Sequence, residues 1–177
     1  MNYILIMTEG KTELEFLNVL LEKGILKFSV NELLMEKIFH GRQIDGEIKG
    51  YIQGIDYNDQ VFIYRVGDKL SDKLTIPSSI LPEKISGVVD VSTTPEFEVL
   101  FLLYEGLYDE FLKVKSIEKP SCFYKKQNKK YKKQSTFVRD YFNNMSEEEI
   151  VDLIDLYVKK HGKTLKKNQK TLKEIIK

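Results

Sequence analysis

The stretch Tyr3-Ile4-Leu5-Ile6-Met7-Thr8-Glu9-Gly10-Lys11-Thr12-Glu13 decides the fold. Residues 3–7 are apolar and partly β-branched, a pattern typical of a buried strand. Beyond Gly10 the apolar side chains recur at helical spacing, at Leu14, Leu17, Leu20 and Leu21. Gly24 then stands where a glycine commonly ends a helix. This stretch therefore predicts a strand, a tight loop and a helix.

Two later apolar runs repeat the pattern of a strand followed by a polar loop. Val61–Tyr64 is followed by Arg65-Val66-Gly67-Asp68, and Ile85–Val91 is followed by Ser92-Thr93-Thr94-Pro95-Glu96. The almost wholly apolar run 97–104 then predicts a helix that packs on a sheet. A further strand, followed by a helix, is expected around Leu26–Val30.

Strands that alternate with helices predict the α/β class. We expect a small, mostly parallel sheet flanked by helices, with the strand-end loops gathered at one edge. Residues 1–112 form this predicted α/β domain. Residues 113–177 form a Lys-rich loop and C-terminal helices packed on it, one helix being opened by the capping box Ser146-x-x-Glu149. The basic C-terminal extension is thus predicted to be helical.

The charge of the chain is segregated, although the 177 residues carry a net charge of only +1. Residues 1–112 hold 19 acidic and 10 basic side chains. Residues 113–133 hold nine lysines and one acidic residue, and residues 159–177 hold eight lysines and one. An acidic body with two strongly basic segments favours a nucleic-acid partner.

Several classes of protein are excluded by the sequence. No run reaches the roughly 18–20 apolar residues of a membrane helix, and the N-terminus lacks the pattern of a signal peptide, so we expect a cytoplasmic protein without a membrane partner. The lone Cys122 excludes an internal disulfide framework. With only His40 and His161, which we interpret as surface or loop residues, a Cys/His zinc site is disfavoured. A metal would be a hard cation held by carboxylates.

Three acids at the predicted strand ends, Glu9, Asp68 and Glu96, are the candidate catalytic residues. Gathered at one edge of the sheet, they could bind Mg²⁺ or Mn²⁺, which prefer oxygen ligands, and Glu98 is a further candidate ligand. Each acid also has a simpler interpretation. Glu9 could complement the N-terminus of the first helix, as could its neighbour Glu13. Asp68 could cap the segment after it, and Glu96 could complete a capping box with Thr93.

Arg65 has two interpretations as well. It could hold a substrate phosphate beside the acids, or it could pair with an acidic neighbour in the fold. A Walker phosphate loop is excluded. That motif requires a glycine five residues before Gly10 of the tripeptide Gly10-Lys11-Thr12, and Leu5 stands there.

The order of these loops resembles the Toprim-type domain of RloB-like and OLD-family phage-defence proteins. The matching residues are Thr8–Glu13, the strand and turn Val61–Asp68, and the segment Ser92–Leu100, which together cover roughly residues 1–110. The resemblance implies a Mg²⁺-dependent enzyme that cleaves nucleic-acid phosphodiesters. By position, Glu9 would be the general acid/base, and Asp68 with Glu96 or Glu98 would bind the metal. An ATPase is a candidate protein partner.

One departure from the Toprim pattern bears on activity. Toprim proteins usually carry Asp-x-Asp at the end of the middle strand, and here those two places are Arg65 and Gly67. Two carboxylates are lost and a cation is gained, which weakens metal affinity. The chain is therefore expected to be a divergent nuclease of DNA or RNA, in phage defence or mobile-element conflict, or an inactive binding or interaction module with the same fold.

The Lys-rich segment 113–133 interleaves lysines with aromatic residues, as in surfaces that neutralise phosphates while rings stack on bases. The alternative is a solvated loop that balances the acidic body. The candidate substrate-binding residues are Lys11, Arg65, Lys69, Tyr124, Lys125, Lys126, Lys129, Lys130 and Tyr131.

Overall fold

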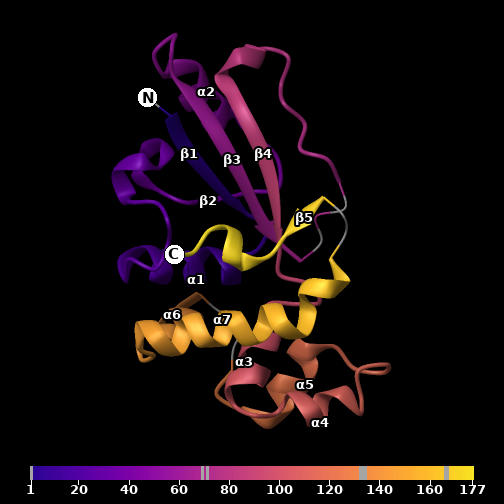
Figure 1. The fold of residues 1–177 in the computed structure, drawn as a ribbon. Helices are drawn as coiled ribbons and strands as arrows, with labels where there is room; N and C mark the ends of the chain where they lie inside the picture. The colour runs from indigo at the N-terminus through magenta and orange to yellow at the C-terminus, as the bar shows by residue number, and fades with distance from the viewer. Residues whose placement is uncertain (1, 69, 71, 132–134, 166–167) are drawn as a thin grey trace.

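The computed structural model describes residues 2–68, 70, 72–131, 135–165 and 168–177. Within them, five strands form one sheet in the order β2-β1-β3-β4-β5, and every neighbouring pair is parallel (Figure 1). The strands are β1 (Asn2–Thr8), β2 (Phe39–His40), β3 (Gln60–Gly67), β4 (Ile85–Ser92) and β5 (Gln169–Lys170). The parallel α/β fold expected from the sequence is confirmed.

Seven α-helices lie in the described part of the chain. They are α1 (Lys11–Glu22), α2 (Gly46–Gly54), α3 (Val99–Tyr104), α4 (Tyr108–Leu112), α5 (Pro120–Gln127), α6 (Ser135–Asn143) and α7 (Glu147–His161). Short 3₁₀ turns lie at Val30–Glu32, Leu34–Glu36, Pro82–Lys84, Gly162–Thr164 and Leu172–Glu174. In the part of the chain described, we find no helix with the length and apolarity needed to cross a bilayer.

The sheet separates two hydrophobic cores, because successive side chains of a strand point to opposite faces. Ile6 of β1 and Val66 of β3 belong to the larger core, which is completed by α1, α3, α6 and α7. Leu5 and Ile63 belong to the smaller core, which α2 covers with Ile48 and Ile52. Figure 1 shows α6 and α7 beside α1, with α3, α4 and α5 beyond them.

The helix ends follow the chemistry of the sequence. After α1, Gly24 adopts a φ of 68°, a left-handed conformation that glycine reaches without a steric penalty. At the start of α7 the Ser146 side chain accepts a hydrogen bond from the Glu149 backbone, and the Glu149 carboxylate accepts one from the Ser146 backbone. The predicted capping box is therefore confirmed.

The strand expected around Leu26–Val30 is wrong. The backbone there pairs with the C-terminal tail, since the Lys27 amide donates to the Ile175 carbonyl and the Lys177 amide to the Ile25 carbonyl. Leu26 forms an isolated antiparallel bridge with Ile176. Only 3₁₀ turns follow at residues 30–36, and the strand beside β1 is the short β2.

The C-terminal extension is built into the fold. Its helices α5, α6 and α7 contribute Tyr124, Phe142 and Ile154 to the larger core, together with α1 and α3 of the N-terminal segment. The tail then adds β5 beside β4. Leu172 and Ile176 of the tail are buried in the same core, so residues 1–112 and 113–177 share one hydrophobic interior.

Candidate functional site: an acidic cleft at the carboxyl edge of the sheet

The three central strands end side by side. Thr8 of β1 is level with Val66 of β3, and Gly67 is level with Ser92 of β4. The loops that follow enclose a cleft of about 390 Å³. Its lining includes five acidic residues, Glu9, Glu13, Asp68, Glu96 and Glu98, together with Gly10, Lys11, Thr12 and Phe97. All four candidate metal ligands from the sequence thus lie around one cleft.

Glu9 lies in the turn between β1 and α1, where its amide donates a 2.9 Å hydrogen bond to the Val66 carbonyl. Its carboxylate lies 3.3 Å from a guanidinium nitrogen of Arg42. Glycine at position 67 makes room for it: a β-carbon there would lie 2.7 Å from both the Cβ and the Oε2 of Glu9. The end of β3 and Glu9 therefore fit together only with glycine at position 67.

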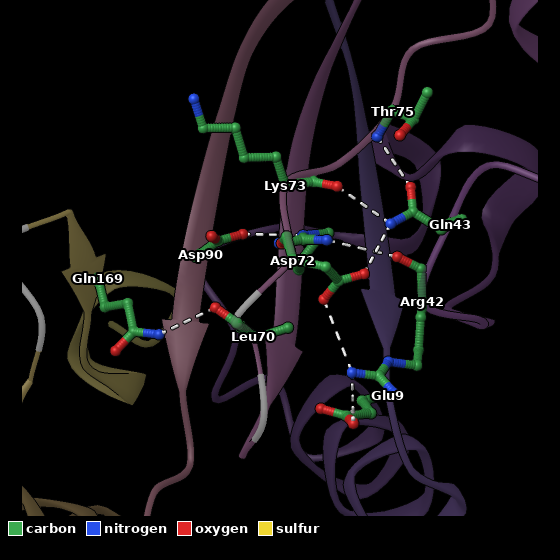
Figure 2. A network of polar contacts seen from close by, with 10 residues as sticks. Glu9, Arg42, Gln43, Leu70, Asp72, Lys73, Thr75, Asp90 and Gln169 are labelled. Atoms are coloured by element: carbon green, nitrogen blue, oxygen red, sulfur yellow. Dashed lines mark hydrogen bonds and ion pairs between the residues drawn. The ribbon is translucent and has the colours of Figure 1, made fainter.

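Arg42 joins Glu9 to a polar network on the loop after β3 (Figure 2). The same guanidinium lies 3.6 Å from the Asp72 carboxylate. Gln43 donates 2.8 and 3.1 Å hydrogen bonds to the Asp72 carboxylate and the Lys73 carbonyl. The Gln43 hydrogen bond, aided by the guanidinium groups of Arg42 and Arg65, lowers the pKa of Asp72. The network fixes a cation against the acidic cleft.

Glu96 and Glu98 use their carboxylates differently from the expected capping box. Helix α3 begins at Val99, with Glu98 as its N-cap. Thr93 cannot open that helix, because its amide bonds to the Gly67 carbonyl and extends the strand pairing. Glu96 instead accepts a 3.1 Å hydrogen bond from the Ser121 amide at the start of α5. The capping-box interpretation of Glu96 is therefore wrong.

Glu98, Glu13 and Asp68 differ in burial. Glu98 is only 1% exposed and accepts a 2.7 Å hydrogen bond from the Tyr131 hydroxyl. Glu13, in the first turn of α1, is also buried and lies 3.4 Å from the hydroxyl of Thr93, which donates to it. Asp68 is partly exposed, and its backbone carbonyl accepts a hydrogen bond from the Thr94 hydroxyl. Asp68 is therefore the more accessible of these three acids.

The donor chemistry of the cleft suits Mg²⁺ or Mn²⁺, because carboxylate oxygens are the ligands that hard cations prefer. The spacing of the carboxylates does not yet suit a cation, because in the described ranges no three His, Cys, Asp or Glu side chains are grouped closely enough to hold a metal ion. Glu9, Glu96 and Glu98 each have a partner within the protein. The cleft thus gathers the right ligands, and some of them must turn from their partners for a cation to bind.

Arg65, a candidate for substrate binding, is 2% exposed and is not among the residues that line the cleft. Its Nε donates a 2.8 Å hydrogen bond to the carboxylate of Asp90, the residue level with it on β4. Its Nη2 donates to the Asp72 carbonyl at 2.7 Å. A side chain so buried cannot contact a phosphate on the surface, so the substrate-binding role is wrong and the pairing with an acidic neighbour is confirmed.

The two tyrosines proposed to stack on bases are buried. Tyr124 is 0% exposed and stacks on Phe101 with ring centroids 5.0 Å apart, and Tyr131 is 4% exposed. Their hydroxyls donate hydrogen bonds to Glu105 and Glu98. Burial raises the pKa of both tyrosines. Aromatic rings enclosed in this way cannot reach a nucleobase, so that prediction is wrong.

The candidate lysines are placed differently from the tyrosines. Lys125, Lys126, Lys129 and Lys130 are exposed at the end of α5 and in the turn after it. Lys126 forms a 2.7 Å ion pair with Glu118. Lys11 is exposed beside the acidic cleft, and Lys69 lies outside the described residues.

Sequence reasoning missed Arg42, the cation that contacts Glu9. It stands in the glycine-rich stretch 40–58, where no periodicity assigns a structure, and no motif marks it. Comparison of the chain with protein-family models, with curated proteins and with solved structures finds no match.

Proposed function

We propose that the chain is a divalent-metal-dependent enzyme that cleaves phosphodiester bonds in DNA or RNA, a divergent form of the Toprim type that its motifs resemble. The observation that carries this proposal is the cleft lined by five acidic residues at the carboxyl ends of β1, β3 and β4. In open parallel sheets, ligands bind at this edge. Simple helix capping would not bring acids from three separate loops to one cleft.

The proposal assigns a role to each acid. Glu9, in the turn after β1, would act as the general acid/base, and Asp68 with Glu96 or Glu98 would hold the cation. A bound Mg²⁺ or Mn²⁺ would polarise the phosphoryl oxygen and neutralise developing negative charge. Lys11 is exposed at the cleft and would attract the phosphate. Arg42 would hold Glu9 in place until substrate and metal arrive.

The exposed lysines of α5 support a nucleic-acid substrate. They lie in a segment with nine lysines and one acidic residue, which would neutralise phosphates along a strand. The resemblance suggests a cytoplasmic role in phage defence or mobile-element conflict, with an ATPase as a candidate partner, and these belong to the same proposal.

A second candidate function, a nucleic-acid-binding module without catalysis, is favoured by one observation. No three metal-ligating side chains in the described ranges are grouped around a common point, and Glu9 already has a cationic partner in Arg42. In this case Arg42 would permanently neutralise Glu9, which would have no catalytic role. Nucleic-acid binding would then not need a divalent cation.

Cleavage assays separate the two functions. Labelled single-stranded DNA, duplex DNA and RNA are incubated with the protein in Mn²⁺, in Mg²⁺ and in EDTA. We expect metal-dependent cleavage of at least one substrate, lost in Glu9→Gln and Asp68→Asn. Glu83→Gln, which changes an exposed acid in the turn before β4, is the matched control and should keep full activity. Binding without cleavage in every metal would support the second function and contradict the first.

A further inference from the structure

A second hollow adjoins the acidic cleft. This groove of about 700 Å³ lies between the loop after β4, the loop between α4 and α5, and the last residue of α7. Figure 1 shows the α4–α5 loop projecting near the end of α7. Glu96 lines both hollows, so the groove and the acidic cleft share a wall. The volume is in the range of small-ligand sites, roughly 300–1,000 Å³.

The floor of the groove is apolar. It includes Pro95, Phe111, Leu112 and Pro120, and Ile117 is 85% exposed on the loop that borders it. An isoleucine so fully exposed beside an apolar floor leaves a surface on which an apolar group would be buried favourably.

The rim of the groove is cationic. Lys115 and Lys119 are exposed on the α4–α5 loop and line the groove. The acid between them, Glu118, has its carboxylate 2.7 Å from Lys126 and is thereby neutralised. The rim therefore complements an anionic group, while the floor suits an apolar one.

The wall of the groove at the end of α7 is held in place by aromatic contacts. His161 Nε2 lies 3.1 Å from the Tyr108 hydroxyl, and the two rings are perpendicular. The His161 ring also stacks on Tyr157, whose hydroxyl donates a 2.5 Å hydrogen bond to the Thr94 carbonyl. His161, half-buried at the end of α7, is therefore part of a packed wall of the groove. Loop, helix and groove are thus held together before any ligand arrives.

We propose that this groove binds one nucleotide unit of a single-stranded nucleic acid, with its base on the apolar floor and its phosphates at Lys115 and Lys119. This inference rests on the proposed function and names the part of the substrate that the protein binds beside the cleft. Because Glu96 belongs to both hollows, a strand seated in the groove presents its next phosphodiester to the acidic cleft.

Fluorescence of a single introduced tryptophan tests the inference, because the chain contains none. Ile117→Trp places the reporter at the groove, and its 85% exposure means that the fold will accept the change. Tyr57→Trp is the control, since Tyr57 is 73% exposed in the turn before β3, at the opposite end of the strands. Both variants are titrated in EDTA with adenosine 5′-monophosphate and with a five-residue oligodeoxyadenylate.

We expect saturable quenching in the Ile117→Trp variant, because a stacked base quenches tryptophan, and only a linear collisional decrease in the Tyr57→Trp variant. The quenching should saturate at a lower concentration of the oligonucleotide than of the monophosphate, because the additional phosphates of the oligonucleotide contact the lysines. If the monophosphate binds as tightly, the groove is a site for free nucleotides and the strand proposal is overturned. Identical linear quenching in both variants overturns the inference altogether.

Charge reversal gives an independent measurement. Lys115→Glu in the Ile117→Trp background should weaken oligonucleotide binding about fivefold at low salt. Lys49→Glu on α2 makes the same change of net charge away from the groove and should leave the affinity unchanged. Equal losses in both variants would mean that net charge alone governs binding, which overturns the assigned contact.

These binding experiments are independent of the cleavage assay, because they are done in EDTA and need no metal. Saturable quenching without cleavage in any metal refutes the enzyme and keeps the groove. Cleavage without saturable quenching at Ile117→Trp refutes the groove and keeps the enzyme.

Discussion

The Glu9 side chain fills the space that a side chain on residue 67 would need, because a β-carbon on Gly67 would lie 2.7 Å from the Cβ and from the Oε2 of Glu9. In the proposed resemblance to the Toprim pattern, position 67 would be the second place of the Asp-x-Asp pair. A carboxylate there would displace Glu9. The first place holds Arg65, which is turned into the fold toward Asp90. Both departures are thus coupled to the surrounding structure, and restoring one carboxylate would not rebuild the motif.

Gly67→Ala should lower the free energy of unfolding by about 1–3 kcal/mol, because the added methyl group overpacks against Glu9. Gly50→Ala is the matched control, since nothing lies within 4 Å of a β-carbon placed there in α2. It should stabilise the protein by about 0.5–1 kcal/mol, as alanine does in a helix. Urea denaturation measures both changes. Equal stability of the Gly67→Ala and native proteins would show that Glu9 is not confined as described.

Arg65→Met should lower the free energy of unfolding by about 3 kcal/mol, because it leaves the largely buried Asp90 carboxylate without its cation. Adding Asp90→Leu should recover part of the loss, since the unpaired charge is removed as well. Nucleic-acid affinity should be unaffected in Arg65→Met. A variant of native stability that binds nucleic acid poorly would restore the substrate role rejected for Arg65.

Alkaline pH should destabilise the fold through its buried tyrosines. Burial raises the pKa of Tyr124, Tyr131 and Tyr157, so the folded protein keeps these protons after the unfolded chain has released them. The stabilisation is complete below about pH 10, the unfolded pKa, and is lost as pH rises further, by roughly 1.4 kcal/mol per pH unit for each tyrosine.

Urea denaturation across this range measures the slope. Tyr131→Phe should be less stable at neutral pH by about 1–3 kcal/mol, because the hydrogen bond from the Tyr131 hydroxyl to the buried Glu98 is lost. It should also show a shallower alkaline decline. An equally steep decline in Tyr131→Phe would contradict the assignment to this residue.

The exposed lysines of α5 and its following turn should set the salt dependence of nucleic-acid binding. With about five phosphates neutralised, log affinity should fall with log salt at a slope near −4. Lys129→Gln should make the slope shallower by about one. Lys126→Gln should change it less, because Lys126 is paired with Glu118. Fluorescence anisotropy in EDTA measures the slopes. Equal slopes in Lys129→Gln and native protein would show that this surface does not contact phosphates.

Much of the fold could be predicted because the strands and helices carry their own periodicity. The apolar runs at residues 3–7 and 61–64 form strands whose side chains are buried or half-buried on both faces of the sheet. Gly24 and Ser146 mark helix ends by local chemistry. The segment after Gly24 was mispredicted because its partner, around Ile176, lies at the far end of the chain. No local pattern reveals such a pairing.

The candidate site was predictable only in outline. Strand-end acids could be expected at one edge, because parallel strands end together. The side-chain partners could not: Arg42 comes from a segment without periodicity, and Tyr131 reaches Glu98 across 33 positions of sequence. The burial of Tyr124 was missed because lysines surround it in sequence, while in the fold its ring packs on Phe101.

Calorimetric titration with Mn²⁺ tests most directly whether the cleft holds a divalent cation. The native protein should bind Mn²⁺ with measurable heat, Asp68→Asn should weaken that binding about tenfold or more, and Glu83→Gln should bind as the native protein does. Absence of heat from the native protein at millimolar Mn²⁺, or equal binding by Asp68→Asn, would contradict the metal site and with it the proposed enzyme.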